Sequence, residues 1–253
     1  MNIETVKTQL RSLRLSAAAR ELEEVLLQHR KAANLDWFSD LLARELDARK
    51  HNALKLRFKQ AGFPESVTLE TFDFGFNPAI DETTIRELAT LAFIDAHGIA
   101  LLLGQPGVGK THVALALGVA AAHRGYRVYF ATHKKLIEQI TCSRHEGTLD
   151  QFFKRLLSCA LWIIDDWAAV SMNREIAEEV FDLIDRRKYS SGLVLTSNRA
   201  VEEWGEIFPN SVLANATIDR LFEQAHAAVF QGKSYRLKGR LATHELDTTL
   251  RNS

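Results

Sequence analysis

A glycine-rich segment from Gly104 to Thr111, with the sequence GQPGVGKT, limits the possible folds of this chain more than any other feature. It follows the apolar run 99–103 and precedes a helical pattern that starts at His112. A strand, a glycine-rich turn and a helix in this order distinguish a phosphate-binding loop from a chance match. Glycines let the backbone N–H groups converge, and the helix directs its positive N-terminal end toward the same point. We therefore predict an α/β fold around a nucleoside triphosphate site.

The residues of this loop have separate tasks. Lys110 can reach the β- and γ-phosphates, and the hydroxyl of Thr111 can bind Mg²⁺. The predicted nucleotide contacts are Gly104, Gln105, Pro106, Gly107, Val108, Gly109, Lys110, Thr111 and His112.

Two further strands end in polar side chains that belong to the same chemistry. The apolar run 161–164 leads into Asp165 and Asp166, and the run 193–196 leads to Asn198. Open α/β sheets bind ligands at the carboxyl ends of their strands. We expect Asp165 to hold Mg²⁺ together with Thr111, Asp166 to polarise an attacking water, and Asn198 to contact that water or the γ-phosphate.

Strands alternate with helical patterns between residues 66 and 240, which predicts a mainly parallel sheet flanked by helices. Residues 1–65 form a small all-helical domain in our interpretation, which ends where Gly62-Phe63-Pro64 breaks the pattern. We expect 71–76 to be extended, with its aromatic rings packed on the next domain, and 82–93 to be one helix. Residues 241–253 are a polar tail.

The formal net charge is zero, so any contact with DNA requires a local basic patch. One candidate is Lys134 and Lys135, where a helix is expected to begin. The other is Lys55, Arg57 and Lys59, on a helix that we interpret as basic and amphipathic. A solvated helix face explains the second cluster about equally well.

Two cysteines, Cys142 and Cys159, lack metal-ligand spacing, and we expect them to be packing residues in a reducing cytosol. The chain begins without the layout of a signal peptide, and no apolar run is long enough to span a bilayer. These features favour a cytoplasmic protein with no membrane partner.

Several segments together resemble the AAA+ ATPases of the initiator and helicase-loader clade, and within it the IstB family of insertion-sequence helper proteins. The segments are the phosphate loop, Ile163–Asp166, Leu195–Asn198, Ile218–Leu221 and Gly232–Arg236, with the N-terminal helices, Thr71–Phe74 and Glu203–Phe208 narrowing the choice. The similarity extends from about Asn2 to Leu237.

The resemblance implies a bacterial protein that binds ATP and double-stranded DNA, forms homo-oligomers on DNA, and recruits and stimulates a partner transposase. It further implies that Asn198 is the first sensor, that Arg220 is an arginine finger reaching a neighbour's ATP site, and that Arg236 is a second sensor near the γ-phosphate. For both arginines, a surface salt bridge is the alternative.

One residue departs from the family pattern, which usually has Asp-Glu where this chain has Asp165-Asp166. The side chain of Asp is one methylene shorter than that of Glu, and a misplacement of about 1 Å can lower a catalytic rate about a hundredfold. We therefore expect a slow ATPase.

Three other functions remain open from the sequence. A helicase loader of the same clade would use its N-terminal helices to bind a replicative helicase. An ATP-gated assembly protein would bind ATP with little hydrolysis. A small-molecule kinase is weaker, because Asn198, Arg220 and the additional helical domain speak against it.

Overall fold

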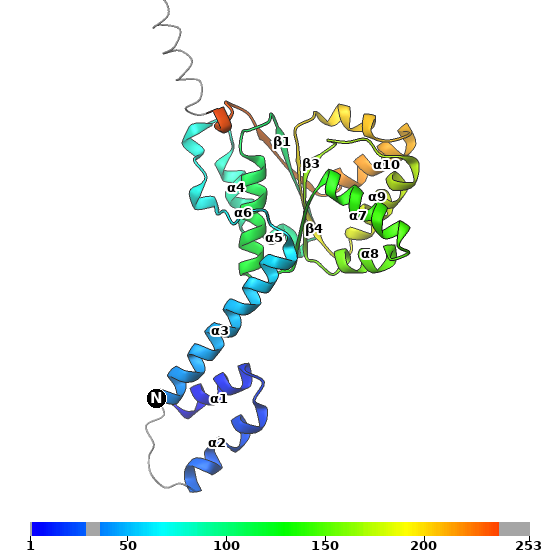
Figure 1. Ribbon diagram of the computed structural model, residues 1–253. Coiled ribbons are helices and arrows are strands. Elements are labelled where there is room, and N and C mark those ends of the chain that lie inside the picture. Colours follow the sequence, from blue (N-terminus) through cyan, green and yellow to red (C-terminus); the bar gives the residue numbers. More distant parts are fainter. Residues whose placement is uncertain (1, 29–35, 238–253) are drawn as a thin grey trace, which may run out of the picture. The chain divides into compact units, whose positions relative to one another are not determined.

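The computed structural model describes residues 2–28 and 36–237, and its contacts divide the chain into two compact units, Met1–Leu56 and Arg57–Ser253 (Figure 1). The division falls within helix α3 (Asp36–Ala61), several residues before the boundary at residue 65 that the sequence predicts. The predicted polar tail, 241–253, lies outside the described residues.

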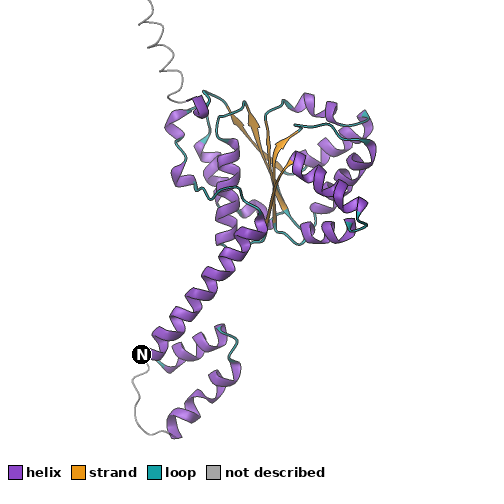
Figure 2. Ribbon diagram, in the orientation of Figure 1, coloured by secondary structure: helices purple, strands orange, loops and turns teal. Residues whose placement is uncertain are grey.

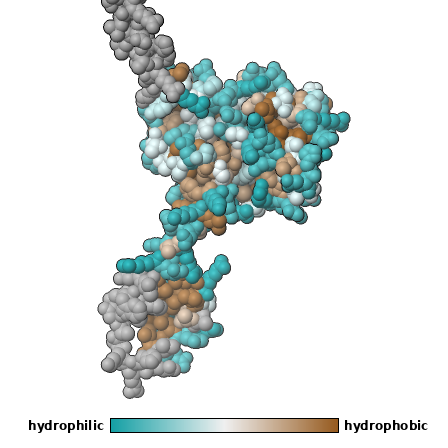
Figure 3. Space-filling view, in the orientation of Figure 1, coloured by the Kyte–Doolittle hydropathy of each residue, from teal (hydrophilic) through white to brown (hydrophobic). Residues whose placement is uncertain are grey.

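The first unit is helical, as expected. It contains α1 (Ile3–Ser12), α2 (Ser16–Gln28) and the first part of α3. The side chain of Asn2 caps α1 by accepting a hydrogen bond from the backbone N–H of Glu4. The buried core of this unit consists of Val6, Leu10, Leu13, Ala19 and Leu42. In the space-filling view, apolar residues form a continuous area on the visible face of this unit (Figure 3).

The second unit is built on a five-stranded sheet in the order β2-β3-β4-β1-β5, and every neighbouring pair is parallel. The strands are β1 (Ile99–Gly104), β2 (Val128–Thr132), β3 (Leu161–Trp167), β4 (Gly192–Ser197) and β5 (Ala225–Phe230). The predicted parallel sheet with flanking helices is therefore confirmed.

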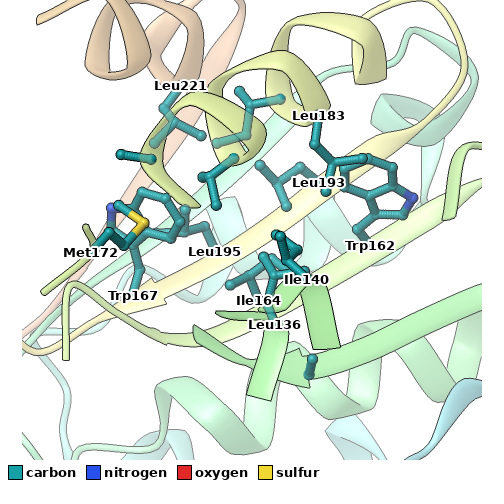
Figure 4. Close-up of a cluster of buried hydrophobic side chains, with 14 of the residues drawn as sticks. Leu136, Ile140, Trp162, Ile164, Trp167, Met172, Leu183, Leu193, Leu195 and Leu221 are labelled. Atoms are coloured by element: carbon teal, nitrogen blue, oxygen red, sulfur yellow. The ribbon is translucent and has the colours of Figure 1, made fainter. Parts of the chain in front are cut away.

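Helices cover both faces of the sheet (Figures 1 and 2). One face carries α4 (Glu82–Ala89), α5 (Ala92–Asp95) and α6 (Lys110–His123). The other carries α7 (His133–His145), α8 (Leu149–Leu157), α9 (Arg174–Arg187) and α10 (Ser211–Phe222). On this second face, alternate strand residues such as Trp162, Ile164, Leu193 and Leu195 pack against the helices (Figure 4).

Two predicted elements differ in the structure. Residues 71–76 are not extended, because Thr71 Oγ1 donates to the carbonyl of Thr68 and Asp73 accepts from the N–H of Phe76, which closes the short 3-10 turns η1 (Leu69–Thr71) and η2 (Phe74–Phe76). The predicted helix 82–93 is interrupted after Ala89, where Leu91 adopts a φ of 64°. A pattern of apolar residues does not reveal an interruption of one turn.

Both cysteines are free, but only Cys159 is buried, so the expectation of a packing role is wrong for the exposed Cys142. Among the described helices, none combines the length and the apolar character needed to cross a lipid bilayer.

Candidate nucleotide-binding site

Three glycines of the phosphate loop have positive φ angles and touch other segments closely. A Cβ atom on Gly104 would lie 2.0 Å from the carbonyl oxygen of Phe230, and one on Gly107 would lie 2.1 Å from Oγ of Ser234. At Gly109 it would lie 2.5 Å from the ring of Phe72. The loop therefore accepts only glycine at these positions, and it is enclosed by segments far away in the sequence.

Lys110, the first residue of α6, is only 4% exposed. Its ammonium group donates hydrogen bonds to the carbonyls of Gly104 (2.8 Å) and Gln105 (2.7 Å) and to Oδ1 of Asn198 (2.7 Å). Burial lowers the pKa of Lys110 to about 8, and the nearby charges of Asp166 and Asp165 oppose this shift. The ammonium is thus held at the loop by neutral oxygens that a phosphate can replace.

Asp165 lies at the carboxyl end of β3 and is almost fully buried. Its Oδ1 accepts hydrogen bonds from Oγ1 of Thr111 (2.9 Å) and from Oγ1 of Thr196 (2.6 Å). Burial raises its pKa, and the hydrogen bond from Thr196 opposes that effect. A hydroxyl and a carboxylate in contact supply the hard oxygen ligands that Mg²⁺ prefers, so Thr111 and Asp165 fit the predicted metal.

Asp166 adopts a φ of 53°, and the pairing of β3 with β4 shifts register between Ile164 and Trp167. Its backbone N–H donates to Oγ1 of Thr196 at 3.0 Å. This turn places the side chain of Asp166 in the pocket, where its Oδ1 accepts from Nδ2 of Asn198 at 2.8 Å. Asn198 therefore connects Lys110 to Asp166.

A pocket of about 410 Å³ opens beside these residues. Pro106, Gly107, Val108, Gly109, Lys110, Thr111, His112, Asp166, Asn198 and Arg236 line it, all of them predicted site residues. Gly104 and Gln105 contribute carbonyls behind it, and Asp165 reaches Thr111.

One wall of the pocket was not predicted from the sequence. Its lining also includes Glu65, Thr71, Phe72, Asp73, Phe76, Asn77 and Tyr235. The Phe72 ring lies 5.5 Å from that of His112, and the Phe76 ring lies 5.0 Å from that of Tyr235. The closely spaced phenylalanines of residues 72–76 indicated packing, but nothing in their spacing pointed to the phosphate loop.

Arg220 lies apart from this pocket. Its Nε donates to Oδ1 of Asp185 at 2.7 Å, and Glu223 lies 3.5 Å from its guanidinium group. The side chain is 41% exposed on α10, so it is accessible at the surface of the unit.

None of the predicted DNA contacts is among the residues that line this pocket. Lys134 and Lys135 are exposed in the first turn of α7. On α3, Lys55 and Lys59 are exposed and Arg57 is half-buried. Leu54 and Phe58 are half-buried and Ala61 is buried, which is the one-sided burial expected of an amphipathic stretch, whereas Leu56 is 54% exposed.

Comparisons with known proteins agree with this geometry. The model of a family described as "IstB-like ATP binding protein" matches residues 8–243. The chain is 42% identical to an insertion sequence IS21 putative ATP-binding protein of Pseudomonas aeruginosa, over 78% of this chain and 74% of the relative. It is 38% identical to the IS5376 counterpart of Geobacillus stearothermophilus, over 78% of this chain and 79% of the relative.

Solved structures show a similar fold. A crystal structure of the DnaC helicase loader aligns with a TM-score of 0.52 and 22% identity, covering 59% of this chain and 87% of the other. The AMPPCP-bound DnaA of Aquifex aeolicus aligns with a TM-score of 0.56 and 20% identity, covering 74% of this chain and 56% of the other.

Proposed function

The chain belongs to the IstB-like ATP-binding family, and from this premise we propose that it is a DNA-binding AAA+ ATPase that helps an insertion sequence to transpose. In this proposal it assembles into homo-oligomers on double-stranded target DNA in the bacterial cytoplasm, and it recruits and stimulates the transposase of the same element. The observation that carries the ATPase part is the chain of hydrogen bonds from Lys110 through Asn198 to Asp166, beside Thr111 and Asp165.

Hydrolysis is proposed to use this chain of contacts as follows. Thr111 and Asp165 would hold Mg²⁺, which would supply positive charge to neutralise the phosphates. Lys110 moves from the loop carbonyls to the β- and γ-phosphates. Asp166 accepts a hydrogen bond from the attacking water, and Asn198 fixes the orientation of its carboxylate. The short side chain of Asp166 makes turnover slow, and assembly on DNA increases it.

Assembly requires functions outside the pocket. Arg220 is proposed to leave Asp185 and reach the γ-phosphate in a neighbouring protomer, while Arg236, which lines the pocket, senses the same group from its own protomer. The helical domain of residues 1–65 is assigned to contacts with DNA or the transposase. DNA contacts are assigned to Lys134 and Lys135 and to Lys55, Arg57 and Lys59.

The decisive experiment measures assembly by size-exclusion chromatography with ATP alone, duplex DNA alone, and both together. We expect a large species only with both ligands, and an unchanged elution volume with both would contradict the proposal. A pull-down with the transposase and with a replicative helicase separates transposition from helicase loading. Single-turnover hydrolysis with and without DNA separates an ATPase from an assembly protein that binds ATP but scarcely hydrolyses it.

A further inference from the structure

A second pocket lies along the first half of β2, which is an edge strand of the sheet, beside the end of α3. It has a volume of about 330 Å³. Arg127 precedes β2 and Cys159 precedes β3, and both line it. The phosphate loop, by contrast, follows the carboxyl end of β1. Since all the strands are parallel, Arg127 and Cys159 lie at the end of the sheet opposite to the phosphate loop.

Three arginines from separate segments line this second pocket: Arg57 near the end of α3, Arg127 in the turn before β2, and Arg155 on α8. A Cβ atom on Gly125 would lie 3.8 Å from Nη2 of Arg57, which places this guanidinium at the turn that carries Arg127. The guanidinium of Arg155 lies over the ring of Phe152 at 5.2 Å. Cys159 lines the same pocket, where burial raises the pKa of its thiol and the positive charges of Arg127 and Arg155 oppose that shift.

These three cations lack acidic partners within the described ranges 2–28 and 36–237, where no carboxylate forms an ion pair with any of them. Other arginines of the same unit differ. Arg144 pairs with Glu175 and Glu179, and Arg174 pairs with Glu178. Three guanidinium groups around one cavity create a positive potential, and their fork of N–H donors matches a phosphate group.

From this arrangement we infer that the pocket of Arg57, Arg127 and Arg155 binds backbone phosphates of DNA. The inference rests on the proposed function, and it locates a DNA contact at the end of the sheet remote from ATP. A protein without net positive charge needs such a local cluster to bind a polyanion. Arg127 and Arg155 are exposed, so a DNA strand that is too large to enter the cavity can still contact them at the protein surface.

The test uses the full-length protein with ATP, Mg²⁺ and a fluorescently labelled duplex of random sequence, and it measures anisotropy over a series of salt concentrations. The variants are R127Q, R155Q and the double variant. R174Q is the matched control, because it removes the same charge from a side chain that is 79% exposed in the same unit. R127K and R155K replace the same side chains but keep the positive charge, so they separate loss of charge from a folding defect. ATP affinity and thermal melting are followed in every variant.

We expect each Gln variant to bind DNA about tenfold more weakly, because each loses a charged hydrogen bond to phosphate. The slope of log affinity against log salt should fall by about 0.9 for each phosphate that a variant no longer neutralises, whereas the Lys variants and R174Q should keep the slope of the unmodified protein. ATP affinity should be unchanged throughout.

Three results would overturn the inference. If R127Q and R155Q bind DNA like R174Q, the pocket is not a DNA contact, while the proposed function stands. If the unmodified protein does not bind DNA even at low salt, the proposed function and the inference both fail. If inorganic phosphate, titrated in a calorimeter, binds the unmodified protein but not the double variant, and DNA affinity is equal in both, the pocket takes free phosphate instead of DNA.

Discussion

Asn198 contacts both Lys110 and Asp166, so one amide fixes the proposed phosphate ligand and the proposed water ligand. Thr196 does the same for the adjacent carboxylates: its hydroxyl donates to Asp165 and accepts from the N–H of Asp166. In the proposed mechanism, side chains at the ends of β3 and β4 therefore couple nucleotide binding to hydrolysis.

The pKa of Lys110 predicts how nucleotide affinity depends on pH. Without nucleotide the ammonium loses its proton as pH rises through about 8, because burial lowers its pKa. A bound triphosphate favours the charged form, so binding above this pH takes up a proton, and affinity should fall about tenfold for each further pH unit. Titration calorimetry in buffers of different ionisation enthalpy measures this uptake.

K110A is the control. It should bind nucleotide weakly at every pH and without proton uptake, and uptake in K110A equal to that of the unmodified protein would assign the effect to another group.

Asp166→Glu tests whether the length of this side chain limits turnover. The longer carboxylate restores the reach of the Glu that the resemblance to the IstB family implies at this position, so ATP turnover per protomer should rise, by up to about a hundredfold. D166N keeps the hydrogen-bonding shape without the charge, and it should bind ATP but lose hydrolysis. Turnover in D166E at or below that of the unmodified protein would show that our account of the shorter side chain is wrong.

At the scale of elements, the segment after β5 closes the pocket. The buried side chain of Asn77 accepts from the backbone N–H of Lys233 (2.9 Å) and donates to the carbonyl of Lys233 (3.0 Å). The N–H of Tyr235 donates to the carbonyl of Gly107 at 2.8 Å. These bonds hold Tyr235 and Arg236 at the phosphate loop.

N77A should therefore weaken ATP binding although it leaves the residues of the phosphate loop unchanged. It removes both bonds to Lys233, which should lower the free energy of unfolding by about 1–3 kcal/mol. N173A is the control: Asn173 caps α9 through the N–H of Ile176 (2.9 Å), and its loss should cost about 1 kcal/mol with no change in ATP affinity. Urea unfolding and nucleotide titration measure the two quantities, and equal ATP affinities in N77A and N173A would contradict this role of Asn77.

The parts of the site that the sequence predicts are local in the chain. The phosphate loop and the two strand ends could be located because periodicity identifies strands, and the carboxyl ends of parallel strands meet at one edge. The wall of Phe72, Phe76 and Tyr235 could not be predicted, since it depends on how 65–77 and 232–236 meet over the loop. The same holds for Arg127 and Arg155, which are far apart in the sequence and line one pocket only in the folded chain.

For the whole molecule, the question at Arg220 is whether it acts within its own protomer or on a neighbouring protomer of an assembly. It lies outside the nucleotide pocket of its own chain, and Asp185 and Glu223 hold it at the surface. If it acts on a neighbour, R220A and D166N should each be inactive alone, and a mixture of the two should recover part of the ATP turnover, because some interfaces combine an intact pocket with an intact arginine. D185N is the control for the ion pair: it should retain turnover. A mixture as inactive as its components, or a loss in D185N equal to that in R220A, would assign Arg220 to structure within one protomer.

Assembly in our proposal depends on nucleotide bound at the phosphate loop. Sedimentation velocity of the unmodified protein and of K110A, each with ATP and duplex DNA, tests it most directly, with nucleotide affinity measured on the same samples. The account predicts that K110A loses ATP affinity and stays a small species while the unmodified protein forms a large one. Equal affinity and equal sedimentation of the two proteins would contradict it.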